Sequence, residues 1–123
     1  MRYMPLFFDV AGREILIIGG GKVALRRARQ FSEAGARLTV VAPEILSEFN
    51  GMPETTLIRR GAAIDDLHEN FTFVIIASSN TKVNDTIAAA CRDKRILFNR
   101  CDSFSDGDFI GGELGRIMKE VGI

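Results

Sequence analysis

Cysteine and histidine are scarce in this chain, and their scarcity limits the chemistry that it can carry. Its 123 residues include two cysteines and one histidine. Cys91 and Cys101 form no C-x-x-C pair, and His68 lies alone in a polar turn, so the sequence predicts no zinc site and no other metal site. We therefore expect two reduced thiols and a cytoplasmic protein.

An excess of charge and long apolar runs are also missing. The 16 Lys and Arg residues balance the 16 Asp and Glu residues, whereas a general nucleic-acid binder normally carries a basic excess. The apolar patch at residues 4–8 is interrupted by Pro5 and is too short for a signal peptide or a membrane span. No repeat or linker divides the chain, so residues 1–123 are predicted to form one domain.

A glycine turn between a buried strand and a helix is the most informative stretch of the chain. Residues 15–18 are apolar and mostly β-branched, Gly19, Gly20 and Gly21 follow, and a helical pattern begins at Lys22. This context favours a dinucleotide site over a simple tight turn, because the G-x-G-x-x-A pattern falls between a strand and a helix. Gly21 would let a pyrophosphate approach the backbone, and the N-terminus of the helix would attract it.

Apolar strands alternate with helical patterns along the chain, which predicts a doubly wound parallel α/β sheet with a Rossmann-like fold. The expected strands cover residues 14–19, 36–42, 55–60, 71–77 and 96–99. The expected helices cover residues 22–34, 81–94 and 112–121. The last helix is short and amphipathic, and we expect it to pack on the core or on a partner through Leu114, Ile117, Met118 and Val121.

Ligands of such sheets bind beyond the carboxyl ends of the strands, where the strand order reverses. That rule selects the segments 19–23, 42–44, 77–80 and 99–102. Glu44 follows the second strand with no Arg or Lys beside it, which favours NAD over NADP; the alternative is a carboxylate that stabilises a helix N-terminus. The polar residues Ser78, Ser79 and Asn80 can cap the next helix. Capping is the expected duty of Ser78 and Ser79, and it is compatible with backbone contacts to the cofactor.

Two charged features allow more than one interpretation. Asp102 follows the last strand on the rim where chemistry is expected, so it is either a proton donor or acceptor beside a hydride-transfer site or a loop residue that caps its own backbone. The basic start of the first helix, with Lys22, Arg26, Arg27 and Arg29, is either a solvated face or a region that attracts anions.

Two long stretches of the chain resemble one known family. RYMPLFFDVAGREILIIGGGKVALRRARQFSEAGARLTVVAPEI, at residues 2–45, is similar to the N-terminal domain of siroheme synthase. That domain is the module for precorrin-2 dehydrogenase and sirohydrochlorin ferrochelatase activity. FVIIASSNTKVNDTIAAACRDKRILFNRCD, at residues 73–102, resembles a second stretch of the same family. The resemblance covers most of the chain to about residue 110.

The resemblance implies NAD-dependent oxidation of precorrin-2 to sirohydrochlorin, a step of siroheme biosynthesis. It implies that Asp102 accepts a proton as hydride leaves the macrocycle. The family uses the corresponding Asp in metal insertion as well, but no metal-ligand cluster in this sequence supports that second activity. The family's cofactor contacts carry over to Gly19, Gly20, Gly21, Lys22, Val23, Pro43 and Glu44.

Two departures from the family concern the substrate. After residue 110 the family continues with a proline, a dimerisation segment and a helical domain, whereas this chain has Gly111-Gly112 and a short helix. We therefore expect a second copy or a separate subunit to complete the substrate site; the alternative is a truncated NAD-binding module without catalysis of its own. Arg100 and Cys101 replace a small apolar pair, and Arg100 is expected either to pair with carboxylates of the substrate or to lie on the surface.

Overall fold

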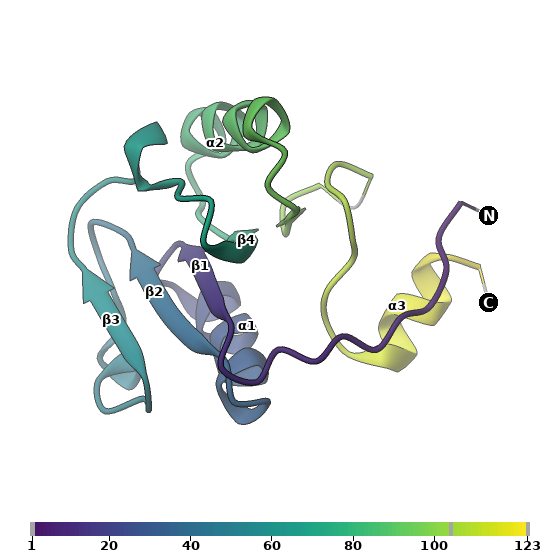
Figure 1. Cartoon of the computed structure of the whole chain (residues 1–123), viewed down its shortest axis with the longest axis horizontal. Coiled ribbons are helices and arrows are strands. Elements are labelled where there is room, and N and C mark those ends of the chain that lie inside the picture. The colour runs from purple at the N-terminus through teal and green to yellow at the C-terminus, as the bar shows by residue number, and fades with distance from the viewer. Residues whose placement is uncertain (1, 104, 123) are drawn as a thin grey trace.

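A parallel five-stranded sheet forms the centre of the computed structural model, which describes residues 2–103 and 105–122. The elements in chain order are β1 (Glu14–Ile18), α1 (Lys22–Glu33), β2 (Arg37–Val41), η1 (Ser47–Phe49), β3 (Thr55–Ile58), η2 (Ile64–Asp66), β4 (Phe71–Ile76), α2 (Thr81–Lys94), β5 (Phe98–Arg100) and α3 (Leu114–Glu120). The strands lie in the order β3-β2-β1-β4-β5, with α1 and α2 on opposite sides of the sheet (Figure 1). This arrangement confirms the predicted doubly wound α/β fold.

The middle strand, β1, is buried on both faces. It pairs in parallel with β2 on one side and with β4 on the other. Ile15 and Ile17 belong to the core cluster that includes α1, whereas Leu16 and Ile18 belong to the cluster that includes α2. Residues 15–18 of this strand are buried and therefore apolar, whereas Glu14 at its start is exposed. The unbroken apolar run explains why the sequence signal of β1 is strong.

The strand order reverses beside β1, and this reversal defines the edge at which a ligand site is expected. From β1 the sheet extends through β2 to β3 on one flank, and the later strands β4 and β5 lie on the other flank. β1 and β4 are adjacent, and the chain leaves their carboxyl ends toward opposite faces of the sheet, which opens a crevice between the two turns. Sheets of this kind bind their ligands in that crevice.

Helix α2 has the bounds that the sequence predicts because its first residue is marked by a cap. The Oδ1 atom of Asn80 accepts a hydrogen bond from the backbone N–H of Val83 over 3.2 Å. The expectation that this polar segment caps the helix is therefore confirmed for Asn80 and wrong for Ser78 and Ser79.

Strand β5 begins at Phe98, two residues later than predicted, and the segment 107–109 folds back along it. Gly107 forms an antiparallel bridge with Asn99. The backbone N–H of Asp108 donates to the carbonyl of Phe98 over 2.8 Å, and its Oδ2 atom accepts from the backbone N–H of Phe98 over 3.0 Å. The returning segment thus covers the outer edge of β5 with hydrogen bonds.

The N-terminal segment, residues 2–9, lies against the loop that follows β5 and against the core. Arg2 donates from Nη2 to the carbonyl of Ser105 over 2.9 Å. The ring of Phe8 contacts the ring of Phe73 edge-on, with 4.7 Å between centroids. Helix α3 is shorter than the predicted segment 112–121, and the side chain of Leu114 lies outside the described part of the chain.

No helix in the described residues combines the length and apolarity needed to cross a bilayer.

Candidate functional site

The first two glycines of the turn after β1 are fixed by neighbouring backbone. Gly19 has a φ of 128°, and a Cβ there would lie 2.5 Å from the carbonyl oxygen of Ala77, just past β4. A Cβ on Gly20 would overlap the main chain of Glu44 and Ile45. Glycine is therefore required at both positions, and the close contacts hold the turn against the segments that follow β2 and β4.

The third glycine is open. Around Gly21, no heavy atom of the described residues lies within 4 Å of the position that a Cβ would take. Gly21 is also the N-cap residue of α1, and no side chain caps this helix end. The first N–H groups of α1 and the positive end of its dipole are thus available to an anionic group such as a pyrophosphate, with Lys22 and Val23 exposed beside it.

The segment after β2 forms a second wall beside this opening. The backbone N–H of Leu46 donates to the carbonyl of Gly20 over 2.9 Å, which ties the segment to the glycine turn. Pro43 and Glu44 are both exposed. Residues 42–48 contain no Arg or Lys, so this wall presents a carboxylate and no cation.

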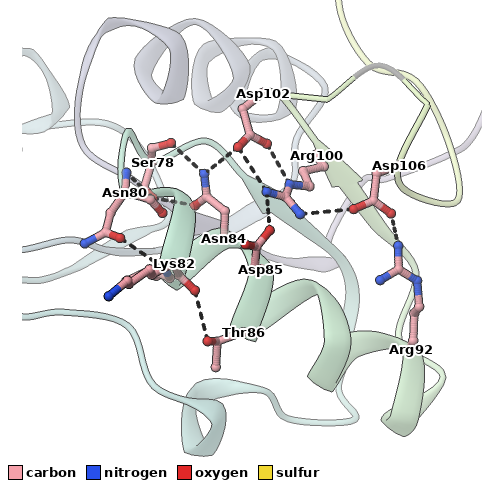
Figure 2. A network of polar contacts seen from close by, with 11 residues as sticks. Ser78, Asn80, Lys82, Asn84, Asp85, Thr86, Arg92, Arg100, Asp102 and Asp106 are labelled. Atoms are coloured by element: carbon pink, nitrogen blue, oxygen red, sulfur yellow. Dashed lines mark hydrogen bonds and ion pairs between the residues drawn. The ribbon is translucent and has the colours of Figure 1, made fainter.

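Past β4, Ser78 and Asn84 link the strand to the first turn of α2 (Figure 2). The Ser78 hydroxyl donates to Asn84 Oδ1 over 2.5 Å, and Asn84 Nδ2 donates to the Ser78 carbonyl over 2.9 Å. Asn84 is only 1% exposed, so packing and hydrogen bonds together fix its orientation. Ser79 is exposed and takes no part in this network.

Asp102 lies where the network reaches the turn after β5. Its Oδ2 atom accepts from Asn84 Nδ2 over 3.0 Å, while Arg100 donates from Nε to Oδ1 over 2.7 Å and from Nη2 to Oδ2 over 3.2 Å. The bonds from Arg100 are the main reason that the pKa of Asp102 lies below its usual value; burial opposes this shift, and Asn84 adds to it. Asp102 is therefore an ionised carboxylate, 32% exposed and held from two sides.

Arg100 is occupied by carboxylates of this chain, so the expectation that it lies on the surface is wrong, and its pairing with carboxylates of the substrate stays a prediction. Its side chain is only 9% exposed, and it pairs with Asp102, with Asp85 at 2.8 Å and with Asp106 at 3.1 Å. Arg92 forms a further ion pair with Asp106 (Figure 2). Three carboxylates around one guanidinium would repel an added anion rather than bind it.

The residues that orient Asp102 escaped the sequence analysis. Asn84 carried one usable signal, because it is a polar residue on the helix face that buries Ile87 and Cys91. Asp85 and Asp106 carried none, since an acidic residue on a helix or in a loop is ordinarily solvated.

Close contacts along the sheet edge connect the glycine turn after β1 with Asp102 after β5. Gly19 approaches Ala77, the next residue, Ser78, holds Asn84, and Asn84 holds Asp102. A ligand seated on the open end of α1 and extending toward β5 would reach an ionised carboxylate. The edge thus offers an anion receptor and a proton acceptor together.

Metal ligands and reactive thiolates are not gathered at this edge. Among the described residues, no group of three or more His, Cys, Asp or Glu side chains is placed to hold a metal ion. Cys91 and Cys101 are free thiols. Burial raises the pKa of Cys91 to about 11 and also raises the pKa of Cys101, so both thiols stay protonated at neutral pH.

Comparison with known proteins assigns the chain to a family. Residues 6–113 match the family model described as "Putative NAD(P)-binding". The siroheme synthase of Ectopseudomonas mendocina is 43% identical over 104 residues, which cover 84% of this chain and 22% of that protein. The precorrin-2 dehydrogenase of Priestia megaterium is 32% identical, over 84% of this chain and 52% of that protein.

A solved structure shows the same fold. SirC, a precorrin-2 dehydrogenase, superimposes with a TM-score of 0.76 at 27% identity, over 97% of this chain and 69% of that one. The sequence-based resemblance to siroheme synthase is thereby confirmed, although the chain spans only about a fifth of the length of the siroheme synthases and about half that of the dehydrogenase. The family match spans the glycine turn, the β4–α2 junction and Asp102 alike, and the chain belongs to this NAD(P)-binding family.

Proposed function

We propose that this chain oxidises precorrin-2 to sirohydrochlorin with NAD as the hydride acceptor. The relatives bear the names siroheme synthase and precorrin-2 dehydrogenase. The observation that carries the proposal is the ionised Asp102, which Asn84 connects to the glycine-turn half of the sheet edge. The free thiols of Cys91 and Cys101 agree with a reducing, cytoplasmic setting.

The residues of the glycine turn fit the cofactor. Gly19 and Gly20 shape the turn, and Gly21 leaves the backbone open for a pyrophosphate at the start of α1. Lys22, Val23, Pro43, Glu44, Ser78 and Ser79 complete the proposed contacts. The exposed carboxylate of Glu44 favours the ribose hydroxyls of NAD and would repel the 2′-phosphate of NADP. When bound, the nicotinamide supplies the acceptor for the hydride.

The proposed task of Asp102 is to receive the proton. Dehydrogenation breaks one C–H bond by loss of hydride and releases one further proton, which a carboxylate on this rim can accept. Arg100 keeps Asp102 ionised but also lowers its pKa and therefore its basicity.

The same guanidinium opposes metal insertion. A divalent ion that approached Asp102 would meet the positive charge of Arg100 at hydrogen-bond distance from the carboxylate. We therefore propose dehydrogenation without chelatase activity for this chain.

The second candidate is an NAD-binding module whose substrate site needs a second copy or a separate subunit. The exposed apolar side chains near the N-terminus favour it, since Met4 is 78%, Leu6 73% and Phe7 94% exposed. This candidate predicts NAD binding without turnover by the isolated chain.

The test is the appearance of NADH absorbance after the protein is mixed with NAD and freshly generated precorrin-2. Asp102→Asn should lower turnover roughly 10²–10⁴-fold and leave NAD affinity unchanged. Asp93→Asn, at an exposed position on α2, is the matched control and should keep full turnover. Equal turnover by the two variants would refute the role of Asp102, and NAD binding without turnover by the parent would favour the second candidate.

A further inference from the structure

A buried cation near the site has no charged partner. Arg27, on α1, is 8% exposed, and its Nε atom is shielded from water without a hydrogen-bond partner. Its side chain donates to the neutral amide oxygen of Gln30 at 3.5 Å and interacts with the thiol of Cys101, and neither partner carries a formal negative charge at neutral pH. None of the ion pairs in the described part of the chain includes Arg27. This corrects the interpretation of the basic helix start as a wholly solvated face.

A second guanidinium converges on the same place. At Gly112, the point where a Cβ would stand lies 3.1 Å and 3.2 Å from the two terminal nitrogens of Arg27, and 3.0 Å from Nη2 of Arg116. Arg116 is exposed and has only a long contact with Glu120, at 3.9 Å. Two cations thus flank Gly112 with no carboxylate between them.

This arrangement contrasts with that of Arg100. Three carboxylates surround Arg100, whereas a buried charge without such a partner is unfavourable. Repulsion between the two positive charges of Arg27 and Arg116 adds to this unfavourable energy. The structure therefore contains one guanidinium that is surrounded by carboxylates and a pair of guanidinium groups with no carboxylate between them.

The phosphates of the cofactor are not placed to be the negatively charged partner of Arg27 and Arg116. The open start of α1 is at Gly21, and Arg27 lies six residues further along the helix, about 9 Å at the α-helical rise. A Cβ on Gly111 would lie 3.8 Å from Nε of Arg27, so the guanidinium lies beside the segment after β5. The positive charges of Arg27 and Arg116 both act on the thiol of Cys101, the residue next to Asp102 in the chain.

We propose that Arg27 and Arg116 form a receptor for a carboxylate group of the substrate. The identification of that carboxylate as an acidic side chain of the tetrapyrrole rests on the proposed function. Gly112 carries no side chain, so the guanidinium tips of Arg27 and Arg116 approach each other beside its backbone, and neighbouring N–H donors of this kind suit a carboxylate. Arg27 and Arg116 thus take the part that sequence reasoning offered to Arg100.

Equilibrium binding of uroporphyrin tests the receptor. Uroporphyrin is a stable macrocycle with carboxylate side chains, and its fluorescence reports binding without any turnover. Arg27→Met and Arg116→Met should each weaken its binding roughly tenfold or more. Arg26→Met removes the same charge from an exposed position of the same helix and should change the affinity less than about twofold. NAD affinity should stay constant in all three variants.

Thermal stability supplies an independent readout. Because Arg27 lacks a charged partner, Arg27→Met should not lower the melting temperature of the ligand-free protein. Arg116→Met provides the binding test at an exposed position if Arg27→Met does not fold. Absence of uroporphyrin binding to the parent, equal losses in Arg26→Met and Arg27→Met, or a loss of NAD affinity in Arg27→Met would each overturn the proposal.

Failure of the proposed function gives a different pattern. Binding of uroporphyrin through Arg27 and Arg116 without formation of NADH from precorrin-2 would support the carboxylate receptor and refute the dehydrogenase activity. Turnover of precorrin-2 that is insensitive to Arg27→Met and Arg116→Met would support the dehydrogenase activity and refute the receptor.

Discussion

Helices α1 and α2 begin at the same edge of the sheet, yet one start is open and the other is closed. α1 begins after Gly21 without a capping side chain, whereas Asn80 caps α2. Ser78 and Asn84 add further side-chain bonds around the start of α2. The open start keeps its N–H groups for a ligand, and the closed start holds side chains that position Asp102.

The largest effect on stability should come from Gly19→Ala, which distorts the backbone of the turn before the open N-terminus of α1. The new Cβ would lie 2.5 Å from the carbonyl of Ala77 at a φ of 128°. We expect a loss of about 3 kcal/mol or more in the free energy of unfolding, measured by urea denaturation.

Gly12→Ala is the matched control, because Gly12 has a φ of 73° and no heavy atom within 4 Å of its Cβ position among the described residues. Its loss should be about 1 to 2 kcal/mol, from backbone strain alone. Equal losses in the two variants would mean that the contact with Ala77 contributes nothing.

Arg100→Met should lower the free energy of unfolding by about 1 to 3 kcal/mol at neutral pH. The substitution leaves the three carboxylates around Arg100 facing one another without a cation. Arg100 lowers the pKa of Asp102, so its stabilisation is complete above the usual Asp pKa of about 3.9 and is lost as the pH falls through the lowered pKa. The deficit of the variant should therefore shrink in acid. The acid limb of the pH–turnover profile should move to higher pH.

Arg60→Met separates the two readouts of that experiment. Arg60 lowers the pKa of Asp66 by a hydrogen bond in the same way, far from the site along the chain. Its stability should respond to acid with the same sign, while its pH–turnover profile should match that of the parent. A shifted profile in Arg60→Met would show that the shift is not specific to Asp102.

Gly21→Asp should close the open start. Position 21 has room for a side chain, and an Asp there would cap α1 and interact favourably with its dipole, adding a few tenths of a kcal/mol to 1 kcal/mol. NAD affinity should fall roughly tenfold or more, because the carboxylate occupies the anion receptor and repels the pyrophosphate. Calorimetric titration with NAD and thermal melting give the two values.

Gly21→Ser distinguishes charge from bulk, since it can cap α1 without a negative charge. It should bind NAD more tightly than Gly21→Asp does. The same affinity in both variants would argue against an anion at this helix end.

The smallest effect should come from Asn80→Ala, which opens the closed start. Loss of the bond to Val83 should lower the free energy of unfolding by about 1 kcal/mol. NAD affinity should not change, because Asn80 is used for the helix and not for the ligand. A fall in NAD affinity comparable to that of Gly21→Asp would contradict the division between the two helix starts.

Local sequence was sufficient for the elements whose signals lie within a few residues. The apolar run of β1 and the glycines after it specify a buried strand and an open turn, and the bounds of α2 follow from the polar residues before it. The same reasoning left the cap among Ser78, Ser79 and Asn80 and expected it of the two serines, because it cannot tell which of three adjacent polar side chains points back toward the helix.

The partners of Arg100 and Arg27 lay beyond local reasoning. Asp85 is 15 positions before Arg100 in the chain, and the folding of α2 against β5 brings the two side chains together. Arg27 is buried by Gly111 and Gly112, more than 80 positions away. Whether a cation is neutralised depends on such distant contacts, so sequence reasoning left an anion-binding role open both for Arg100 and for the basic start of the first helix.

The folded-back segment 107–109 occupies one edge of the sheet, at β5, so a strand from another chain could pair with the sheet only at its other edge. Its bonds to Phe98 and Asn99 use the backbone groups that a further strand would need at β5. β3 is the other end of the sheet, and three strands separate it from β5. A strand added from another chain would therefore join at β3, and assembly through the sheet would leave the turn that holds Asp102 uncovered.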